Sequence, residues 1–200
     1  IDFLVSFTGC RAMYCSSDGW DCSQNDGVVT FNYCWTFSNG KDSGGTHYST
    51  GSDGNGFSLG NNTMDATGKT QRSLKNCIAA DNYGFGITEN NSGYPQIKMD
   101  IFNCFSYRND YGFVNYITSS TLQQATYRNN IAYNNISSDT QWNDASKLIH
   151  DHNSWNSDGP SVTDPDFVSL DMMELTSPRQ VDGSLPEINF GALVIGSDLI

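Results

Sequence analysis

Short stretches in which apolar and polar residues alternate recur along the chain. The clearest apolar pairs stand two positions apart: Val5/Phe7, Val29/Phe31, Met99/Ile101 and Ala125/Tyr127. A period of two is typical of a β-strand that turns one face to a protein core. The pattern therefore predicts several short strands, each upstream of one of the similar segments described next.

Five similar six-residue segments punctuate the chain. They are CRAMYC from Cys10, CWTFSN from Cys34, CIAADN from Cys77, CFSYRN from Cys104 and NIAYNN from Asn130. The third position is small in all five, and the sixth is Asn in four, at Asn39, Asn82, Asn109 and Asn135. A glycine followed by an aromatic residue comes next, at Gly19, Gly56, Gly84 and Gly112. Matching residues at matching offsets indicate a repeat of about 25 residues, interrupted by a Gly- and Ser-rich loop over residues 40–54.

Repeats of this length, each with two or three short strands and turns between them, predict an all-β fold, a parallel β-helix. Successive coils of such a solenoid lie about 4.8 Å apart, so equivalent side chains stack into ladders. Stacked asparagines at a bend can hydrogen-bond along the ladder and satisfy the backbone of the turn. A β-sandwich is the rival fold, but it gives no reason for matching residues at matched offsets.

The repeat fades after about residue 140, where Pro and Gly mark irregular turns. The open end of a solenoid needs a cover, because an exposed strand edge recruits other chains. We therefore expect residues 1–139 to form the β-helix coils. Residues 140–200 are predicted to be an irregular C-terminal flank or cap of the same domain.

The charge balance narrows the classes of partner. Acidic residues outnumber basic ones 22 to 10, which gives a net charge of −12. This argues against nucleic acid and against anionic membrane surfaces, but not against an acidic substrate, because a bound divalent cation inverts the local field. No apolar run approaches the roughly 18 residues of a membrane span. No basic-then-apolar leader opens the sequence, so we expect any signal peptide to have been removed or to lie outside it.

The six cysteines allow two interpretations. Three disulfides are one of them, but a domain of 200 residues can bury a core without such bridges. Four of the six fall at equivalent positions of the repeat, which favours stacked, buried thiols.

The stretch CSSDGWDC, residues 15–22, is the first candidate for chemistry. Its repeat position puts Asp21 on a ladder with Ser58, Gly86 and Val114, while Asp18 and Ser17 stand at the bend before it. Two carboxylates and a hydroxyl at a rigid corner suit a hard cation such as Ca²⁺, which takes oxygen ligands. The alternative is a turn with solvent-exposed acids.

Several motifs in their order along the chain resemble those of family 9 polysaccharide lyases, the pectate lyase group. They are DGWDC at residues 18–22, GSDGNGFSLGNN at 51–62, KNCIAADNYGFGI at 75–87, and DPDFVSLD and SPRQVDGSLPEINF within 164–190. The resemblance covers essentially all 200 residues and corresponds to the C-terminal part of the catalytic domain. It implies a right-handed parallel β-helix with an irregular C-terminal flank.

The resemblance also implies an activity. Members of the family cleave polygalacturonate-type chains by β-elimination, with Ca²⁺ held by aspartates and a lysine as base. The cation acidifies the proton on C5, and the amine removes it as the bond from C4 to oxygen breaks. A secreted, monomeric protein that acts on an acidic polysaccharide is the corresponding expectation.

Two positions of this chain depart from the family pattern. The aspartate run reads Asp-Asp-Gly-x-Asp in the family and Ser17-Asp18-Gly19-Trp20-Asp21 here, so Ser17 replaces one carboxylate. The family lysine falls at Ser58, whose hydroxyl does not titrate near neutral pH. Asp18, Asp21 and Ser17 are thus the candidate metal ligands, and Ser58 marks the catalytic position.

Other residues are candidates for the roles that these departures leave open. Lys41 and His47, in the inserted loop, are possible substitute bases or else exposed loop residues. Asn55, Arg108 and Tyr111 are candidate substrate-binding residues, because Arg binds carboxylates bidentately and Tyr can stack on a sugar ring. His150 and His152 could bind a metal, but without a nearby third ligand a structural role is favoured.

Three hypotheses for function remain. The first is a Ca²⁺-dependent pectate lyase or close relative. The second is a catalytically impaired relative that binds acidic polysaccharide without cleaving it. The third is a purely structural or adhesin-like solenoid.

Overall fold

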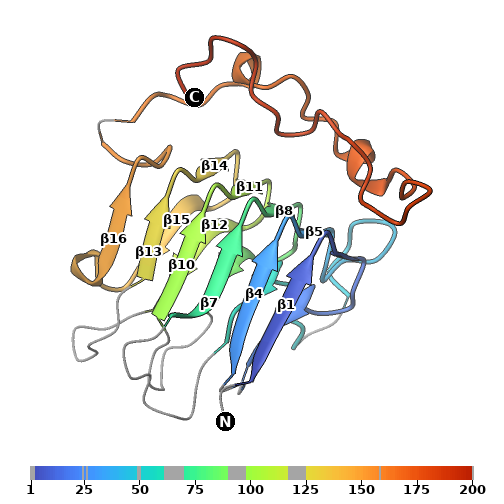
Figure 1. Cartoon of the computed structure of the whole chain (residues 1–200), viewed down its shortest axis with the longest axis horizontal. Helices are drawn as coiled ribbons and strands as arrows, with labels where there is room; N and C mark the ends of the chain where they lie inside the picture. Colours follow the sequence, from blue (N-terminus) through green and yellow to red (C-terminus); the bar gives the residue numbers. More distant parts are fainter. Residues whose placement is uncertain are drawn as a thin grey trace.

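A computed structural model of the chain describes residues 3–23, 25, 27–48, 51–60, 70–89, 98–116, 125–157 and 159–199. Its strands form three parallel sheets along one axis (Figure 1). The first sheet contains β1 (Leu4–Thr8), β4 (Val28–Asn32), β7 (Thr70–Lys75), β10 (Lys98–Phe102), β13 (Ala125–Arg128) and β16 (Leu148–Asp151). The second contains β2 (Arg11–Met13), β5 (Trp35–Phe37), β8 (Ile78–Ala80), β11 (Phe105–Tyr107) and β14 (Ile131–Tyr133). The third contains β3 (Trp20–Asp21), β6 (Phe57–Ser58), β9 (Phe85–Thr88), β12 (Tyr111–Asn115) and β15 (Ser138–Trp142).

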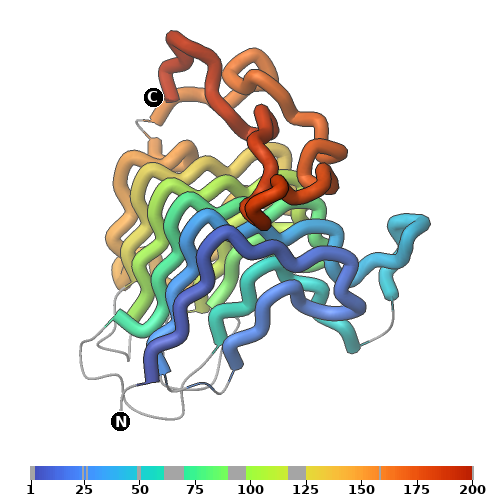
Figure 2. Tube along the Cα trace, turned by 45° about the vertical axis from the view of Figure 1, so that its right-hand side comes forward, coloured from blue at the N-terminus to red at the C-terminus, as the bar shows by residue number. Residues whose placement is uncertain are grey.

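We call these sheets A, B and C. Consecutive strands along the chain belong to different sheets, and each strand pairs with the equivalent strand of the next coil. In the tube of Figure 2 the coils lie against one another in sequence order, from blue to orange. The predicted parallel β-helix is therefore confirmed.

The alternating residues face the interior of the coils, as expected. Phe7 pairs with Phe31, and Phe31 with Leu74, so one apolar ladder runs down sheet A. The core also contains Phe57, Ile87 and Phe113 from sheet C. Burying such side chains is worth about 1.5–3 kcal/mol each, which makes these ladders the main source of stability.

The asparagine ladder is confirmed too. The side-chain amide of Asn39 donates to Asn82 Oδ1 at 2.7 Å, Asn82 donates to Asn109 at 2.8 Å, and Asn109 to Asn135 at 3.2 Å. Each acceptor oxygen also takes the backbone N–H of the preceding member. Asn39, Asn82 and Asn109 are fully buried, so the ladder satisfies the bend between sheets B and C without water.

The cysteines of the repeat form a second ladder at the bend between sheets A and B. Cys34, Cys77 and Cys104 are buried, and all six cysteines of the chain are free thiols. Asn130 and Asn153 continue this ladder, because Cys104 N–H donates to Asn130 Oδ1 and Asn130 N–H to Asn153 Oδ1.

The C-terminal residues form an arm along the outside of the coils. In Figures 1 and 2 the arm runs from β16 across the solenoid towards the first coils and then returns. It contains the short 3-10 helices η2 (Asp164–Asp166) and η3 (Met172–Thr176); η1 (Ala145–Lys147) precedes β16. Its buried residues Phe167, Leu175 and Phe190 pack on sheet B, where Phe167 and Phe190 stand 5.2 and 5.7 Å from the Phe105 ring.

The coils continue past residue 139. β15 spans that position, and β16 pairs in parallel with β13, so sheet A extends to Asp151. The division of the domain at residue 139 stays a prediction, and the arm itself begins after β16. None of the described helices has the length and apolarity that a membrane crossing needs.

Candidate functional site

The first candidate site is the corner before β3. Asp18 lies there half-buried, and its carboxylate accepts a hydrogen bond of 2.7 Å from the Asn55 backbone N–H of the next coil. Burial raises the pKa of Asp18, while hydrogen bonds from Asn55 and Ser58 oppose this and the charge of Asp53 adds to it. Asp18, Asn55 and Ser58 are therefore brought together at this corner.

Asp21 lies at the end of β3, beside Ser58 of β6. Its carboxylate is exposed and accepts hydrogen bonds from the backbone N–H and the hydroxyl of Ser23 in its own turn. Ser17 is exposed at the corner.

The predicted ladder through Asp21 needs one correction. Ser58 pairs with Thr88, not with Gly86, and Thr88 pairs with Val114. Gly84 and Gly86 stand two positions apart, so either could match Gly56 of the preceding coil. In the structure it is Gly86 that lies next to Gly56. A Cβ on Gly56 would lie 2.5 Å from the Gly86 carbonyl oxygen, so this close approach requires glycine.

Ser58 is only 1% exposed, on β6, which lies between β3 and β9 in sheet C. A hydroxyl at this position can hydrogen-bond, and it helps to hold the Asp18 carboxylate, but it cannot take up a proton as an amine does. The Ser58 position thus lacks the chemistry of a general base.

Tyr111 lies on the same face, two coils further along. Asn55 Oδ1 accepts the Phe85 backbone N–H at 2.9 Å, and the Phe85 ring packs edge-on against Tyr111 at 5.6 Å. Asn55 and Tyr111 are thus joined through Phe85, and an aromatic surface continues from the acidic corner.

Three residues of this face were missed by the sequence reasoning: Asp53, Glu89 and Tyr116. The pKa of Tyr116 is raised by burial first, then by Tyr111 and the charges of Glu89 and Asp53, which places these groups together. Glu89 is fully buried and accepts the Tyr116 backbone N–H at 3.3 Å. The one available signal for Glu89 was its position directly after strand β9.

Lys41 and Arg108 lie at the bend between sheets B and C. The Lys41 amine is 3.0 Å from Asp81 Oδ1 in a largely buried ion pair. Arg108 is exposed, in the left-handed backbone conformation that Asp81 adopts one coil earlier. His47 also belongs to this region, with its ring stacked 3.7 Å from Tyr83. The Lys41 amine is thus engaged by the Asp81 carboxylate, and its role as a substitute base stays a prediction.

The described residues do not provide a complete Ca²⁺ site. Ca²⁺ takes roughly six to eight oxygen ligands. Within the described ranges no three Asp, Glu, His or Cys side chains gather as metal ligands do. Asp21 is turned towards Ser23, and Asp18 is held by Asn55. The donor set of Asp18, Asp21 and Ser17 is thus only part of what the cation needs.

The family described as "Pel9A-like, right handed beta helix region" matches residues 4–135. The chain belongs to this family. The family 9 resemblance and the right-handed coil expected from it are thereby confirmed.

Curated relatives of this Pel9A-like chain include two bacterial proteins named Pectate lyase L. The one from Dickeya dadantii (strain 3937) is 34% identical over 196 residues, and the one from Paenibacillus polymyxa (strain SC2) is 31% identical over 204 residues. Each alignment covers 97% of this chain and 42% of the relative. The chain therefore spans less than half the length of these relatives.

Two solved structures resemble the Pel9A-like coils. The crystal structure of pectate lyase Pel9A has a TM-score of 0.74 and 31% identity, over 96% of this chain and 44% of the other. A rhamnogalacturonan lyase has a TM-score of 0.61 and 23% identity, over 97% and 48% of the two chains, and shows the fold alone.

Proposed function

We propose that this chain is part of a pectate-lyase-like protein that acts on polygalacturonate-type acidic polysaccharide at the outer face of sheet C. The observation that carries the proposal is the extent of the similarity. Pectate lyase L of D. dadantii aligns with 97% of the chain, and the Pel9A structure with 96%. The acidic corner around Asp18 and the aromatic residues Phe85 and Tyr111 then form one continuous surface.

The proposed reaction is β-elimination. A base removes the proton on C5 of a uronate, the C5–H electron pair forms a double bond to C4, and the bond from C4 to the glycosidic oxygen breaks. The departing oxygen takes up a proton and becomes the hydroxyl of the new chain end.

Ca²⁺ belongs to the proposal because of the family resemblance. When bound, it would supply positive charge next to the uronate carboxylate. Asp18 and Asp21 are the ligands that this chain would contribute, with Ser17 as a neutral third, and further oxygens would have to come from elsewhere. Asn55, Tyr111 and Arg108 would contact the sugar chain.

Ser58 favours a second candidate function, the binding of acidic polysaccharide without cleavage. Its hydroxyl stands where the family has its lysine, and Lys41, the substitute base, is engaged by Asp81. Removal of a positioned base typically lowers the rate by 10²–10⁴-fold.

An ultraviolet assay for the unsaturated uronate product separates the two functions. The chain and Ser58→Lys are incubated with polygalacturonate, in Ca²⁺ and in chelator. Product that requires Ca²⁺ in the unchanged chain supports the lyase and a base other than the residue at position 58. Product only in Ser58→Lys supports the binding function. If neither forms product and neither is retarded by polygalacturonate in a native gel, both proposals are wrong.

Localisation and assembly follow from the proposed substrate. Polygalacturonate lies outside cells, so we propose a secreted protein, and a monomer as the functional unit. The extensive packing of the arm on sheet B supports treatment of residues 140–200 as part of the same domain. Light scattering and fractionation of an expressing culture test these two expectations.

A further inference from the structure

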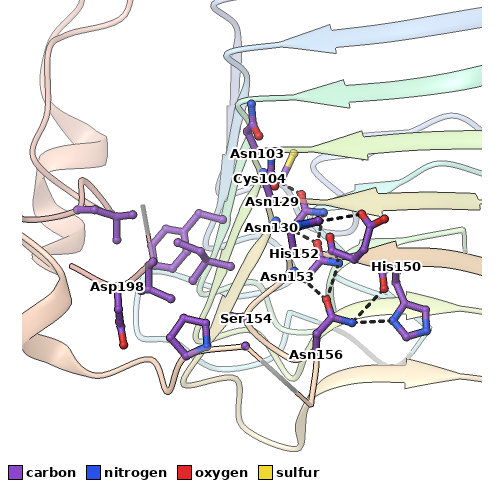
Figure 3. Close-up of a pocket in the computed structure, with 18 residues that line it drawn as sticks. Asn103, Cys104, Asn129, Asn130, His150, His152, Asn153, Ser154, Asn156 and Asp198 are labelled. Atoms are coloured by element: carbon purple, nitrogen blue, oxygen red, sulfur yellow. Dashed lines mark hydrogen bonds and ion pairs between the residues drawn. The ribbon is translucent and has the colours of Figure 1, made fainter. Parts of the chain in front are cut away.

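A large cavity lies away from the face of sheet C, between the bend that joins sheets A and B and the returning C-terminal arm (Figure 3). Its volume is about 810 Å³, within the range of roughly 300–1,000 Å³ that is usual for small-molecule sites. We propose that this cavity binds a neutral saccharide. The proposal does not depend on the function of the sheet C face.

The floor of the cavity is rigid and polar. Asn130 Nδ2 donates to Asn153 Oδ1 at 2.9 Å and to the Ile101 carbonyl, and Asn153 donates to Asn156 Oδ1. The Asn156 amide in turn lies 3.0 Å from His150 Nδ1. These amides are already engaged, so they fix the shape of the site and leave ligand binding to other groups.

Side chains available to a ligand stand above this floor. Asn103, Asn129 and His152 occupy equivalent left-handed positions on successive coils, and all three are exposed. Asn103 donates to Asn76 at 3.3 Å and keeps its carbonyl oxygen for a donor. Asn129 makes no side-chain hydrogen bond within the described part of the chain. Successive coils lie about 4.8 Å apart, so the three side chains form a row of planar hydrogen-bonding groups.

The opposite wall is apolar with one acid. Pro160, Leu193 and Leu199 line it, and in Figure 3 Asp198 lies across from the asparagines. The arm is held at this place, because Gly191, with φ +72°, crosses the Phe105 ring where a Cβ would come within 2.6 Å of it. Planar amides on one side and aliphatic side chains on the other suit the hydroxyls and the C–H face of a sugar.

The charges select against an acidic sugar. Among the described residues that line the cavity there is no Lys or Arg. Asp198 is exposed, and Asp151 is engaged by Arg128, whose Nε lies 2.6 Å away. A uronate would meet the Asp198 carboxylate with no Lys or Arg among the described lining residues, whereas a neutral sugar avoids this repulsion.

Calorimetric titration of the chain with β-1,4-galactotetraose, cellotetraose and tetragalacturonate tests the proposal. We expect saturable binding of at least one neutral tetrasaccharide, weakened about tenfold in Asn103→Gly/Asn129→Gly, because two hydrogen bonds to the sugar are lost. Glycine tolerates the left-handed backbone, so this variant keeps the fold.

The matched control is Asn134→Gly. Asn134 has the same left-handed conformation at an exposed position and does not line the cavity, so its loss should leave binding unchanged. Asp198→Ala, on the exposed arm wall, should weaken binding without any change to the ladder. The proposal is overturned if neither neutral sugar binds, if the double variant binds normally, if Asn134→Gly is equally impaired, or if tetragalacturonate binds at this cavity instead.

Discussion

The carboxylate of Asp18 accepts the backbone N–H of Asn55 at 2.7 Å, which joins the corners of two successive coils. The bond holds a half-buried acid at the start of the sheet C face, and burial raises its pKa above the ordinary value of 3.8. The folded state therefore binds this proton more tightly than the unfolded state does.

Asp18→Asn should make the chain more stable at neutral pH, by about 1 kcal/mol or less, because the ionised carboxylate is disfavoured by burial while an amide oxygen can still accept the Asn55 N–H. In the unchanged chain the Asp18 contribution to stability falls as pH rises from 3.8 to the raised pKa, and this fall should vanish in the variant. Urea unfolding of both chains at several pH values between acid and neutral measures this pH dependence of stability.

Asp182→Asn is the control for this prediction. The Asp182 carboxylate is exposed and accepts the Ser184 N–H, which lowers its pKa. The Asp182 contribution to stability is present above pH 3.8 and is lost as the pH falls. Asp182→Asn should therefore lower the stability at neutral pH, where Asp18→Asn should raise it. Equal changes in both variants would contradict the assignment of burial as the cause at Asp18.

The ladders could be predicted from sequence because a solenoid places equivalent residues of successive repeats one above another. The third position of the repeat illustrates this, since Ala12 pairs with Thr36, Thr36 with Ala79, and Ala79 with Ser106. The pattern failed at Gly84 and Gly86. These two glycines are two positions apart, so the sequence alone could not decide which of them aligns with Gly56 in the preceding coil.

The candidate site could be predicted only where it follows the ladder. Asp21 and Ser58 are neighbours on adjacent strands, as the repeat requires. The partner of Lys41 could not be predicted, because an inserted loop has no register and its contact with Asp81 depends on how it folds back. Glu89 was missed because the repeat gives no sign that an acid after β9 is buried and accepts the Tyr116 N–H of the next coil.

A buried arginine was also beyond the reach of the pattern. Arg72 pairs with Val29 and Met99 at an inward-facing position of sheet A and is fully buried. Its guanidinium donates to carbonyl oxygens of the segments that follow Asp21 and Ser58. These are the carbonyls of Cys22, Asn25, Gly27 and Leu59, in addition to that of Gln71.

Arg72→Met should lower the free energy of unfolding by about 3–5 kcal/mol, because several buried carbonyls lose their donor at once. Arg72→Lys should recover part of the loss, since an ammonium has fewer donors and lacks the planar fork. Urea unfolding measures both. Arg128→Ala, which removes an exposed ion pair with Asp151, is the matched arginine control and should barely change the midpoint. A similar shift of the unfolding midpoint in all variants would contradict a special role for the hydrogen bonds that the buried Arg72 donates to backbone carbonyls.

The asparagine ladder should be equally sensitive at its centre. Asn109→Ala removes an amide that donates to Asn135 and accepts from the side chain and the backbone of Asn82. Each buried group left without a partner costs about 1–3 kcal/mol, so we expect a loss of at least 2 kcal/mol. Thermal unfolding gives the value. Asn143→Ala, at an exposed position, is the control and should shift the midpoint little. Equal shifts of the unfolding midpoint in Asn109→Ala and Asn143→Ala would contradict a role for the hydrogen bonds of the ladder.

The attachment of the arm can be tested by its response to alkali. The Tyr133 hydroxyl donates to Asp164 Oδ1 at 2.5 Å, and this bond to a carboxylate, first, and burial, second, raise the pKa of Tyr133 to about 12. The folded state keeps the phenol proton longer than the unfolded state, whose ordinary value is 10. The stability that the bond supplies is therefore full below pH 10 and is lost as the pH rises from 10 towards 12.

Tyr133→Phe should be less stable than the unchanged chain at neutral pH, and the difference should shrink as the pH rises from 10 towards 12. Tyr48→Phe, at an exposed tyrosine, controls for general alkaline effects. A difference between Tyr133→Phe and the unchanged chain that stays constant with pH would mean that the phenol proton does not hold the arm.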